Sequence, residues 1–249
     1  MIIFKNISKK YGDNLVLDDI NLTIEGGEFV SLIGHSGAGK TTLIQLLIGA
    51  EKPDFGFITV DDYNVTNMDR NTLQYYRRKL GIVFQDLKLL PKKTVYENVA
   101  FVMEVCETSD EEIKKAVPEA LELVGLLDRM NQFPDQLSGG EKQKACIARA
   151  IVHRPRLLIA DEPTGNLDPE STREIVDILL KIHARDTTVL FASHDNQMID
   201  YIRKRVIMLH EGRMVSDEQE GTYELDMLKQ VMNAPSQMVE IHIDGEDEE

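Results

Sequence analysis

The chain has 249 residues, of which 42% are hydrophobic and 29% are charged, which is typical of a soluble globular protein and excludes a mainly disordered chain. Its net charge is −15, from 28 basic and 43 acidic residues, and no dense run of Lys and Arg interleaved with aromatic residues indicates a nucleic-acid surface. We therefore expect one large or two small folded domains that do not bind nucleic acid.

The N-terminal residues lack the pattern of a signal peptide, and no stretch approaches the roughly 18 apolar residues of a membrane span. We therefore expect the chain itself to be cytoplasmic. Its two cysteines, Cys106 and Cys146, have no spacing typical of a disulfide scaffold or a zinc site, so they predict two buried, reduced thiols.

Short apolar segments predict the β-strands. Near the N-terminus, mixed strands are expected at 1–7, 16–24, 29–34 and 57–62. Farther along, near-continuous apolar segments typical of buried parallel strands occur at 80–84, 157–160, 187–192 and 205–210.

Helical periodicity separates these strands, at 40–50, 95–107, 111–124, 139–153 and 169–184. Capping-box spacing supports three of the helix starts, at Thr94, Ser109 and Ser138, and Asp168 followed by proline supports a fourth. Because strands alternate with helices, we expect an α/β fold with a mixed N-terminal sheet and a parallel core sheet. The segment 87–155 contains no convincing strand, which predicts a helical insertion and hence two lobes.

The strongest motif is GHSGAGKT, which lies between a predicted strand and a predicted helix and matches the phosphate-binding P-loop. Its glycines let backbone N–H groups turn toward phosphate, Lys40 adds a positive charge at the β and γ oxygens, and the Thr41 hydroxyl can bind Mg²⁺. The chain is therefore predicted to bind a nucleoside triphosphate. The residues expected to hold its phosphates are Gly34, His35, Ser36, Gly37, Ala38, Gly39, Lys40, Thr41 and Thr42.

Two acidic residues, Asp161 and Glu162, follow the apolar strand LLIA, at the end of the strand where open α/β sheets bind ligands. Adjacent strand side chains diverge, so one carboxylate can face Mg²⁺ while the other reaches the attacking water.

A third motif, LSGGE at 137–141, opens a long predicted helix. Ser138 and Glu141 suffice for a capping box, but Gly139 and Gly140 do not help capping. Close approach of the backbone to an anion would explain these two glycines.

Together these motifs resemble those of the ATP-binding cassette (ABC) ATPases, over Met1 to about Gly221. The resemblance implies that the phosphate loop of one subunit and the LSGG signature of another enclose ATP in a homodimer. It also implies that Tyr11 stacks on adenine, Gln85 senses the γ-phosphate and metal, Asp168 belongs to the D-loop, and His194 contacts the γ-phosphate. In this scheme Thr41, Gln85 and Asp161 hold Mg²⁺, and Glu162 is the general base.

Within that family, three strings resemble the cell-division ATPases of the FtsE type and their relatives in lipoprotein release and MacB-type export: VFQDLKLLPKKTVYENVAF, FPDQLSGGE and IADEPTGNLDP. The stretch after Gln85 is most similar to the FtsE type, which implies an FtsX-like integral membrane partner. The resemblance then implies a peripheral location on the inner face of the cell membrane. The chain departs from the usual family pattern at Glu141, Lys142, Lys144 and Cys146.

The predicted catalytic core comprises 1–86 and 156–221, and the predicted helical signature subdomain comprises 87–155. Segment 217–249 holds 11 acidic residues and one basic residue, which predicts an acidic C-terminal extension at 222–249 with a possible short helix at 223–232. Leu87, Leu89 and Leu90 follow the expected γ-phosphate sensor, and they predict an exposed apolar surface that docks the membrane partner. The alternative is that these leucines pack under the helical lobe.

Three alternatives remain at this point. An exporter ATPase of the lipoprotein-release or MacB type would share every catalytic motif. A nucleic-acid-associated cassette protein would need a long heptad insertion or a second cassette, and the chain has neither. A metabolic kinase with the same phosphate loop would leave LSGGE, Asp168 and His194 unexplained.

Overall fold

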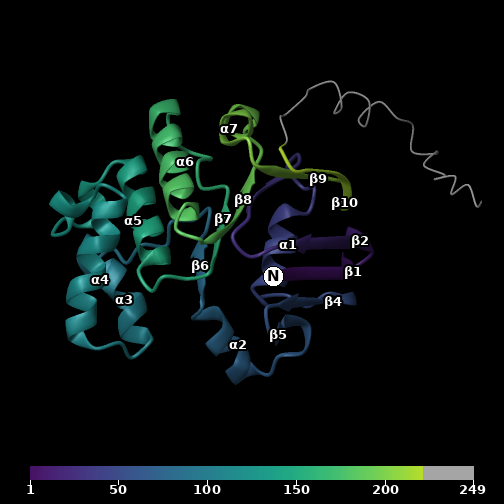
Figure 1. The fold of residues 1–249 in the computed structure, drawn as a ribbon, viewed down its shortest axis with the longest axis horizontal. Coiled ribbons are helices and arrows are strands. Elements are labelled where there is room, and N and C mark those ends of the chain that lie inside the picture. Colours follow the sequence, from purple (N-terminus) through teal and green to yellow (C-terminus); the bar gives the residue numbers. More distant parts are fainter. Residues whose placement is uncertain (221–249) are drawn as a thin grey trace, which may run out of the picture.

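The computed structural model describes residues 1–220, which form two β-sheets with helices packed between and beside them (Figure 1). The possible helix at 223–232 and the acidic extension at 222–249 lie outside the described residues. Within residues 1–220, no helix combines the length and the apolar character that crossing a membrane requires.

The N-terminal sheet has the strand order β2-β1-β4-β5. Its strands are β1 (Ile2–Tyr11), β2 (Asn14–Ile24), β4 (Phe55–Val60) and β5 (Tyr63–Asn64). All the described pairings in this sheet are antiparallel, so the sheet itself is not mixed as expected. The predicted strand at 29–34 belongs to the other sheet.

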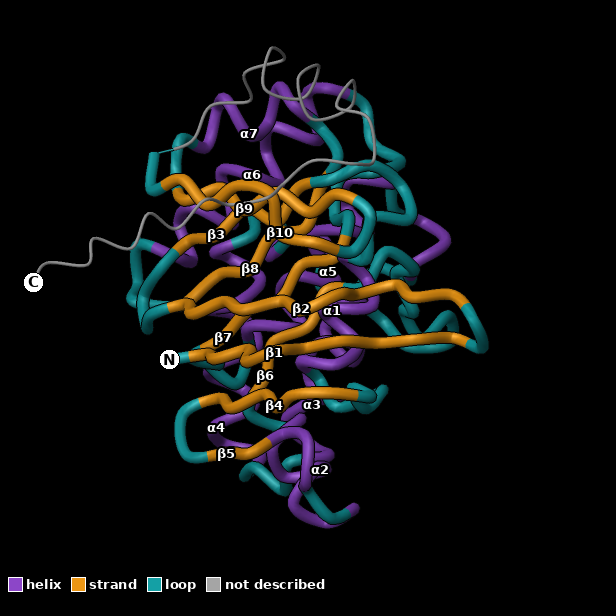
Figure 2. Tube along the Cα trace, turned by 90° about the vertical axis from the view of Figure 1, so that its right-hand side faces the viewer, coloured by secondary structure: helices purple, strands orange, loops and turns teal. Residues whose placement is uncertain are grey.

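The second sheet has the order β10-β9-β3-β8-β7-β6, and its strands are parallel except for β10, which pairs antiparallel with β9. Its strands are β3 (Phe29–Ile33), β6 (Leu80–Val83), β7 (Leu157–Asp161), β8 (Thr188–Ser193), β9 (Arg205–His210) and β10 (Arg213–Glu218). The parallel core sheet of an α/β fold is therefore confirmed. In Figure 2 the strands of the N-terminal sheet run in front of these parallel strands.

The helices are α1 (Lys40–Leu47), α2 (Arg70–Arg77), α3 (Val95–Val105), α4 (Asp110–Leu123), α5 (Gly139–Ile151), α6 (Pro169–His183) and α7 (Asn196–Ile202), with short 3₁₀ turns at Val65–Asn67, Leu127–Arg129 and Pro134–Gln136. Capping boxes at Thr94 and Ser138 are confirmed, as is Asp168 as the N-cap of α6. Ser109 caps α4 through its hydroxyl, without the reciprocal bond of a full capping box.

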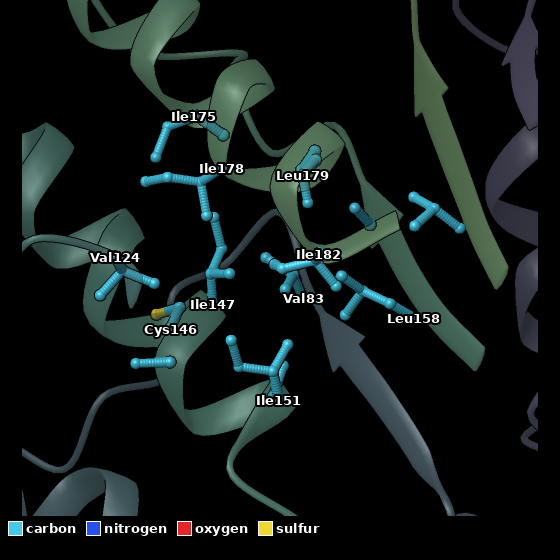
Figure 3. Close-up of a cluster of buried hydrophobic side chains, with 14 of the residues drawn as sticks. Val83, Val124, Cys146, Ile147, Ile151, Leu158, Ile175, Ile178, Leu179 and Ile182 are labelled. Atoms are coloured by element: carbon cyan, nitrogen blue, oxygen red, sulfur yellow. The ribbon is translucent and has the colours of Figure 1, made fainter. Parts of the chain in front are cut away.

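Both faces of the parallel sheet are buried. Along β8, Val189 and Phe191 join a cluster with α3 to α7, whereas Leu190 and Ala192 join a second cluster with α1 and the N-terminal sheet. Figure 3 shows the first cluster, where side chains of α5 and α6 meet those of β6 and β7. The predicted helical insertion therefore shares one continuous apolar core with the sheet that carries the site.

The two cysteines differ in burial. Cys146 is buried in α5, as predicted, but Cys106 is half-buried, so the prediction of a second buried thiol is wrong. Cys106 is the C-cap of α3, and it lines a surface hollow.

Candidate active site

The predicted phosphate loop connects β3 to the N-terminus of α1. Gly39 has φ of 104°, in the left-handed region, and a side chain at this position would collide with Leu17 of β2. No side chain caps α1. The first turn of the helix therefore presents backbone N–H groups and the positive end of its dipole, an arrangement that suits phosphate.

Lys40, Glu162 and His194 form a cluster beside this loop. The Nζ atom of Lys40 donates to the Gly34 carbonyl at 2.7 Å and lies 3.5 Å from Oε1 of Glu162. Nδ1 of His194 lies 2.7 Å from Oε2 of the same carboxylate. Since a carboxylate only accepts hydrogen bonds, Nδ1 is the donor in this contact. Three elements distant in sequence thus bring together a cation, a carboxylate and an imidazole.

Glu162 has an unusual backbone conformation. Its φ is 49°, in the left-handed region, and its N–H donates to the carbonyl of Ala192 at 3.0 Å. Only 12% of its side chain is exposed. The contact with β8 holds this conformation, in which the carboxylate faces Lys40 rather than solvent.

The neighbouring Asp161 points to a different partner. Its Oδ1 atom accepts a hydrogen bond from the Thr41 hydroxyl at 3.5 Å, and burial raises the pKa of its carboxyl group. A hydroxyl, this carboxylate and the amide oxygen of Gln85 are the hard oxygen donors that Mg²⁺ prefers, so the donor set fits that ion. Within residues 1–220, no group of three or more His, Cys, Asp or Glu side chains suggests another metal centre.

Lys40, Thr41, Gln85, Glu162 and His194 line one hollow of about 300 Å³, whereas Asp161 is not part of its lining. Its lining is Val16, Ser36, Gly37, Gly39, Lys40, Thr41, Thr42, Gln85, Glu162 and His194. All but Val16 are residues singled out from the sequence. Val16 lies on β2 and carries no sequence signal that marks it as part of a site.

Other predicted residues lie outside that lining. Tyr11, at the end of β1, is 43% exposed and has the Lys9 ammonium 5.1 Å from its ring centroid. His35 turns toward His210, with 5.2 Å between their ring centroids. Gly34 and Ala38 belong to the same loop without lining the hollow.

The signature residues also lie outside the hollow, at the start of α5. Ser138 caps the helix together with Glu141, whose carboxylate accepts from the Ser138 N–H at 2.8 Å. Gly140 is packed against α6, where an added side chain would come within 2.8 Å of the Ser171 hydroxyl. Packing between helices therefore explains Gly140 without an anion, whereas Gly139 has no such contact.

Asp168 is tied to the same region. Its carboxylate caps α6 and accepts a hydrogen bond from the Ser171 hydroxyl at 2.6 Å, and these bonds lower its pKa. The start of the signature helix and the predicted D-loop therefore meet through one serine.

The three leucines after Gln85 do not form the expected exposed patch. All three are half-buried, and Leu87 and Leu89 pack against the core cluster of the helices. The alternative, that these leucines pack under the helical lobe, is the one that this burial supports, because the segment turns inward toward α5, where helical side chains hold its backbone. Docking of a membrane partner at this segment stays a prediction.

Comparison with known proteins adds independent information. Residues 17–165 match the protein family described as ABC transporter. The chain is 49% identical to the cell division ATP-binding protein FtsE of Mycobacterium tuberculosis, across 91% of this chain and 99% of that protein. It is 46% identical to FtsE of Bacillus subtilis, across 90% and 98%. Methionine import ATP-binding protein MetN 1 of Bacillus thuringiensis is 38% identical, across 87% of this chain and 66% of that protein.

A solved structure supports the same grouping. A dimeric ATP-binding cassette in a post-hydrolysis state, bound to ADP and Pi, matches with a TM-score of 0.80 and 33% identity, across 90% of this chain and all of that chain. The fold, the overall sequence and the motifs of this chain are therefore all similar to those of ATP-binding cassette proteins.

Proposed function

Because the chain belongs to the ABC transporter family and is an ATP-hydrolysing enzyme, we propose that it is the ATPase subunit of an FtsEX-like complex in bacterial cell division. In this proposal it dimerises on ATP, sits on the inner face of the cell membrane and passes its conformational change to an FtsX-like integral membrane protein. Correspondence with FtsE proteins over nearly their whole length favours this role over the exporter alternative.

The observation that carries the catalytic part is the contact of Glu162 with both Lys40 and His194. Glu162 accepts a proton from the attacking water, His194 orients that carboxylate, and Lys40 balances the charge of the β and γ oxygens. A bound Mg²⁺, held by Thr41, Gln85 and Asp161, would neutralise phosphate charge.

The remaining assignments follow the same scheme. The phosphate loop, residues 34–42, holds the phosphates, and Tyr11 stacks on the base. Ser138, Gly139, Gly140 and Asp168 face the nucleotide of the second subunit. The catalytic core at 1–86 and 156–221 and the signature subdomain at 87–155 are then the two parts that move relative to each other.

The first prediction concerns Glu162. Glu162→Gln removes the proton acceptor and the ionic contact with Lys40, so turnover should fall by roughly 10² to 10⁴ while ATP binding persists. Phosphate release and equilibrium ATP binding, measured on the purified protein, check both parts. The matched control is Glu170→Gln, an exposed carboxylate in the first turn of α6, which should hydrolyse ATP normally. Unchanged turnover in Glu162→Gln would show that another group is the base.

The cell-division role has its own test. The protein, co-expressed with the FtsX-like protein of its own organism, should copurify with it from detergent-solubilised membranes. Depletion of the protein should produce undivided filaments. Normal division after depletion, or copurification with an exporter subunit instead, would contradict the proposed role and leave the ATPase assignment intact.

A further inference from the structure

The segment that follows Gln85 is fastened to two helices through its backbone. On the α3 side, the fully buried Asn98 accepts from the Leu90 N–H at 2.7 Å and contacts three backbone carbonyls between Leu90 and Thr94 at 2.9 to 3.1 Å. On the α5 side, the bonds come from Arg149 and Cys146. The segment is therefore not a free loop, and a displacement of Gln85 will also displace the two helices that hold the segment.

Arg149 makes the α5 attachment. Its two terminal nitrogens donate to the Lys88 carbonyl at 2.7 Å and to the Leu87 carbonyl at 2.9 Å. Among residues 1–220, no carboxylate lies within ion-pair distance of its guanidinium. A charged side chain that is satisfied by two neutral backbone carbonyls is suited to holding a chain segment in place.

Two further features belong to this attachment. Cys146, one turn earlier in α5 and labelled in Figure 3, donates its thiol to the Leu87 carbonyl at 3.0 Å. Burial raises the pKa of this thiol to about 11, so it keeps its proton near neutral pH. Lys88 has φ of 47°, a backbone conformation that a non-glycine residue adopts where its surroundings hold it.

We propose that Arg149, assisted by Cys146, is a positioning residue that makes the segment after Gln85 and the signature helix α5 move as one body. The inference rests on the proposed role of Gln85 as the γ-phosphate sensor. Arg149 and Ser138 share one continuous helix of 13 residues plus its cap, so movement of Leu87 and Lys88 displaces the signature end of α5. Arg149 thereby connects nucleotide sensing beside this subunit's own phosphate loop to placement of its signature against the nucleotide of the second subunit.

A double-mutant cycle tests this inference. Arg149→Ala should lower kcat by about tenfold to a hundredfold, because the signature is then misplaced, while KM for ATP changes by less than about threefold. In a Gln85→Ala background the same substitution should lower kcat by less than about twofold. Without the Gln85 side chain, the γ-phosphate no longer moves the segment that Arg149 holds. Arg149→Lys, which keeps a charged donor, should recover part of kcat, and Cys146→Ala should give a smaller loss.

Arg154→Ala is the matched control, because Arg154 follows the same helix but is 78% exposed and bonded to Glu119. It should have normal kcat in both backgrounds. If Arg149→Ala does not fold, the same cycle with Arg149→Lys gives the answer. Normal kcat after loss of Arg149, or losses that multiply in the double variant, would overturn the inference. If Gln85→Ala alone has no effect on hydrolysis, the proposed sensor role fails instead.

Discussion

At the scale of single residues, Asp161 shows how a site can oppose the stability of its own fold. Only 6% of this residue is exposed, and burial raises the pKa of its carboxyl group. A carboxyl group of raised pKa stabilises the fold only in its protonated form. That contribution is complete below its usual pKa of 3.8 and is lost as pH rises through the folded value. At neutral pH the carboxylate therefore destabilises the nucleotide-free protein.

Asp161→Asn should consequently raise Tm in the absence of nucleotide and metal, by about 2–4 °C for each kcal/mol gained. The increase should be larger at pH 8 than at pH 4, and Mg²⁺ with ATP should stabilise the variant less than the parent protein. Thermal unfolding followed by circular dichroism in a chelating buffer measures both effects. The exposed carboxylate of Asp62 offers the control Asp62→Asn, which should leave Tm unchanged at either pH. A lower Tm for Asp161→Asn at pH 8 would contradict the argument.

Sequence motifs predict which residues meet at this site, because the carboxyl ends of parallel strands lie at one edge of a sheet. Lys40, Glu162 and His194 do meet there. The left-handed backbone of Glu162 was not predictable, since it depends on a bond to Ala192 in another strand. Likewise, Gly140 could not be explained within its own helix, because the residue that excludes a side chain, Ser171, comes from α6.

At the scale of elements, the turn before α3 depends on one buried amide. The Asn98 side chain contacts one backbone N–H and three carbonyls of the preceding residues, with its Nδ2 atom facing the carbonyls. Asn98→Asp keeps the shape of the side chain but replaces its donor nitrogen with an oxygen. This buried oxygen then faces three backbone carbonyl oxygens and is repelled by them. The free energy of unfolding should fall by about 3 kcal/mol or more, as for a buried unpaired charge.

Urea unfolding of Asn98→Asp measures this loss, with Asn71→Asp on the exposed surface of α2 as the isosteric control. The control should change the free energy of unfolding by less than about 0.5 kcal/mol. Equal stability of the two variants would mean that the amide contacts do not hold the turn.

The long elements were predictable because their apolar periodicity is strong, whereas several short ones were not. α2 fully buries only Tyr76, with Leu73 partly buried, so its sequence shows only a very short apolar stripe, although Asp69 is a recognisable N-cap. α7 has seven residues, too few for a clear period. β10 alternates half-buried and exposed residues at the edge of the sheet and is rich in polar side chains, so its segment reads as the start of the acidic tail.

At the scale of the whole molecule, the alternation of strands and helices was sufficient to predict the α/β fold. It could not show that the helical segment shares a continuous core with the sheet, because that depends on contacts between distant segments. The described residues place Lys40 in the hollow and Ser138 outside its lining. A single subunit therefore holds the two motifs apart, which accords with a site completed by a second copy.

Assembly supplies the last prediction. In the slow-hydrolysing Glu162→Gln background, ATP with Mg²⁺ should shift the protein from monomer to dimer in sedimentation experiments. Ser138→Arg should abolish that shift, because a long cation at the start of α5 prevents the partner's nucleotide from reaching the signature. Ser109→Arg is the control: it removes the N-cap of α4, another helix capped by serine, at a similar cost of about 1 kcal/mol. It should still dimerise, so loss of a cap cannot explain the difference. A normal dimer in Ser138→Arg would show that the signature does not line the interface between subunits.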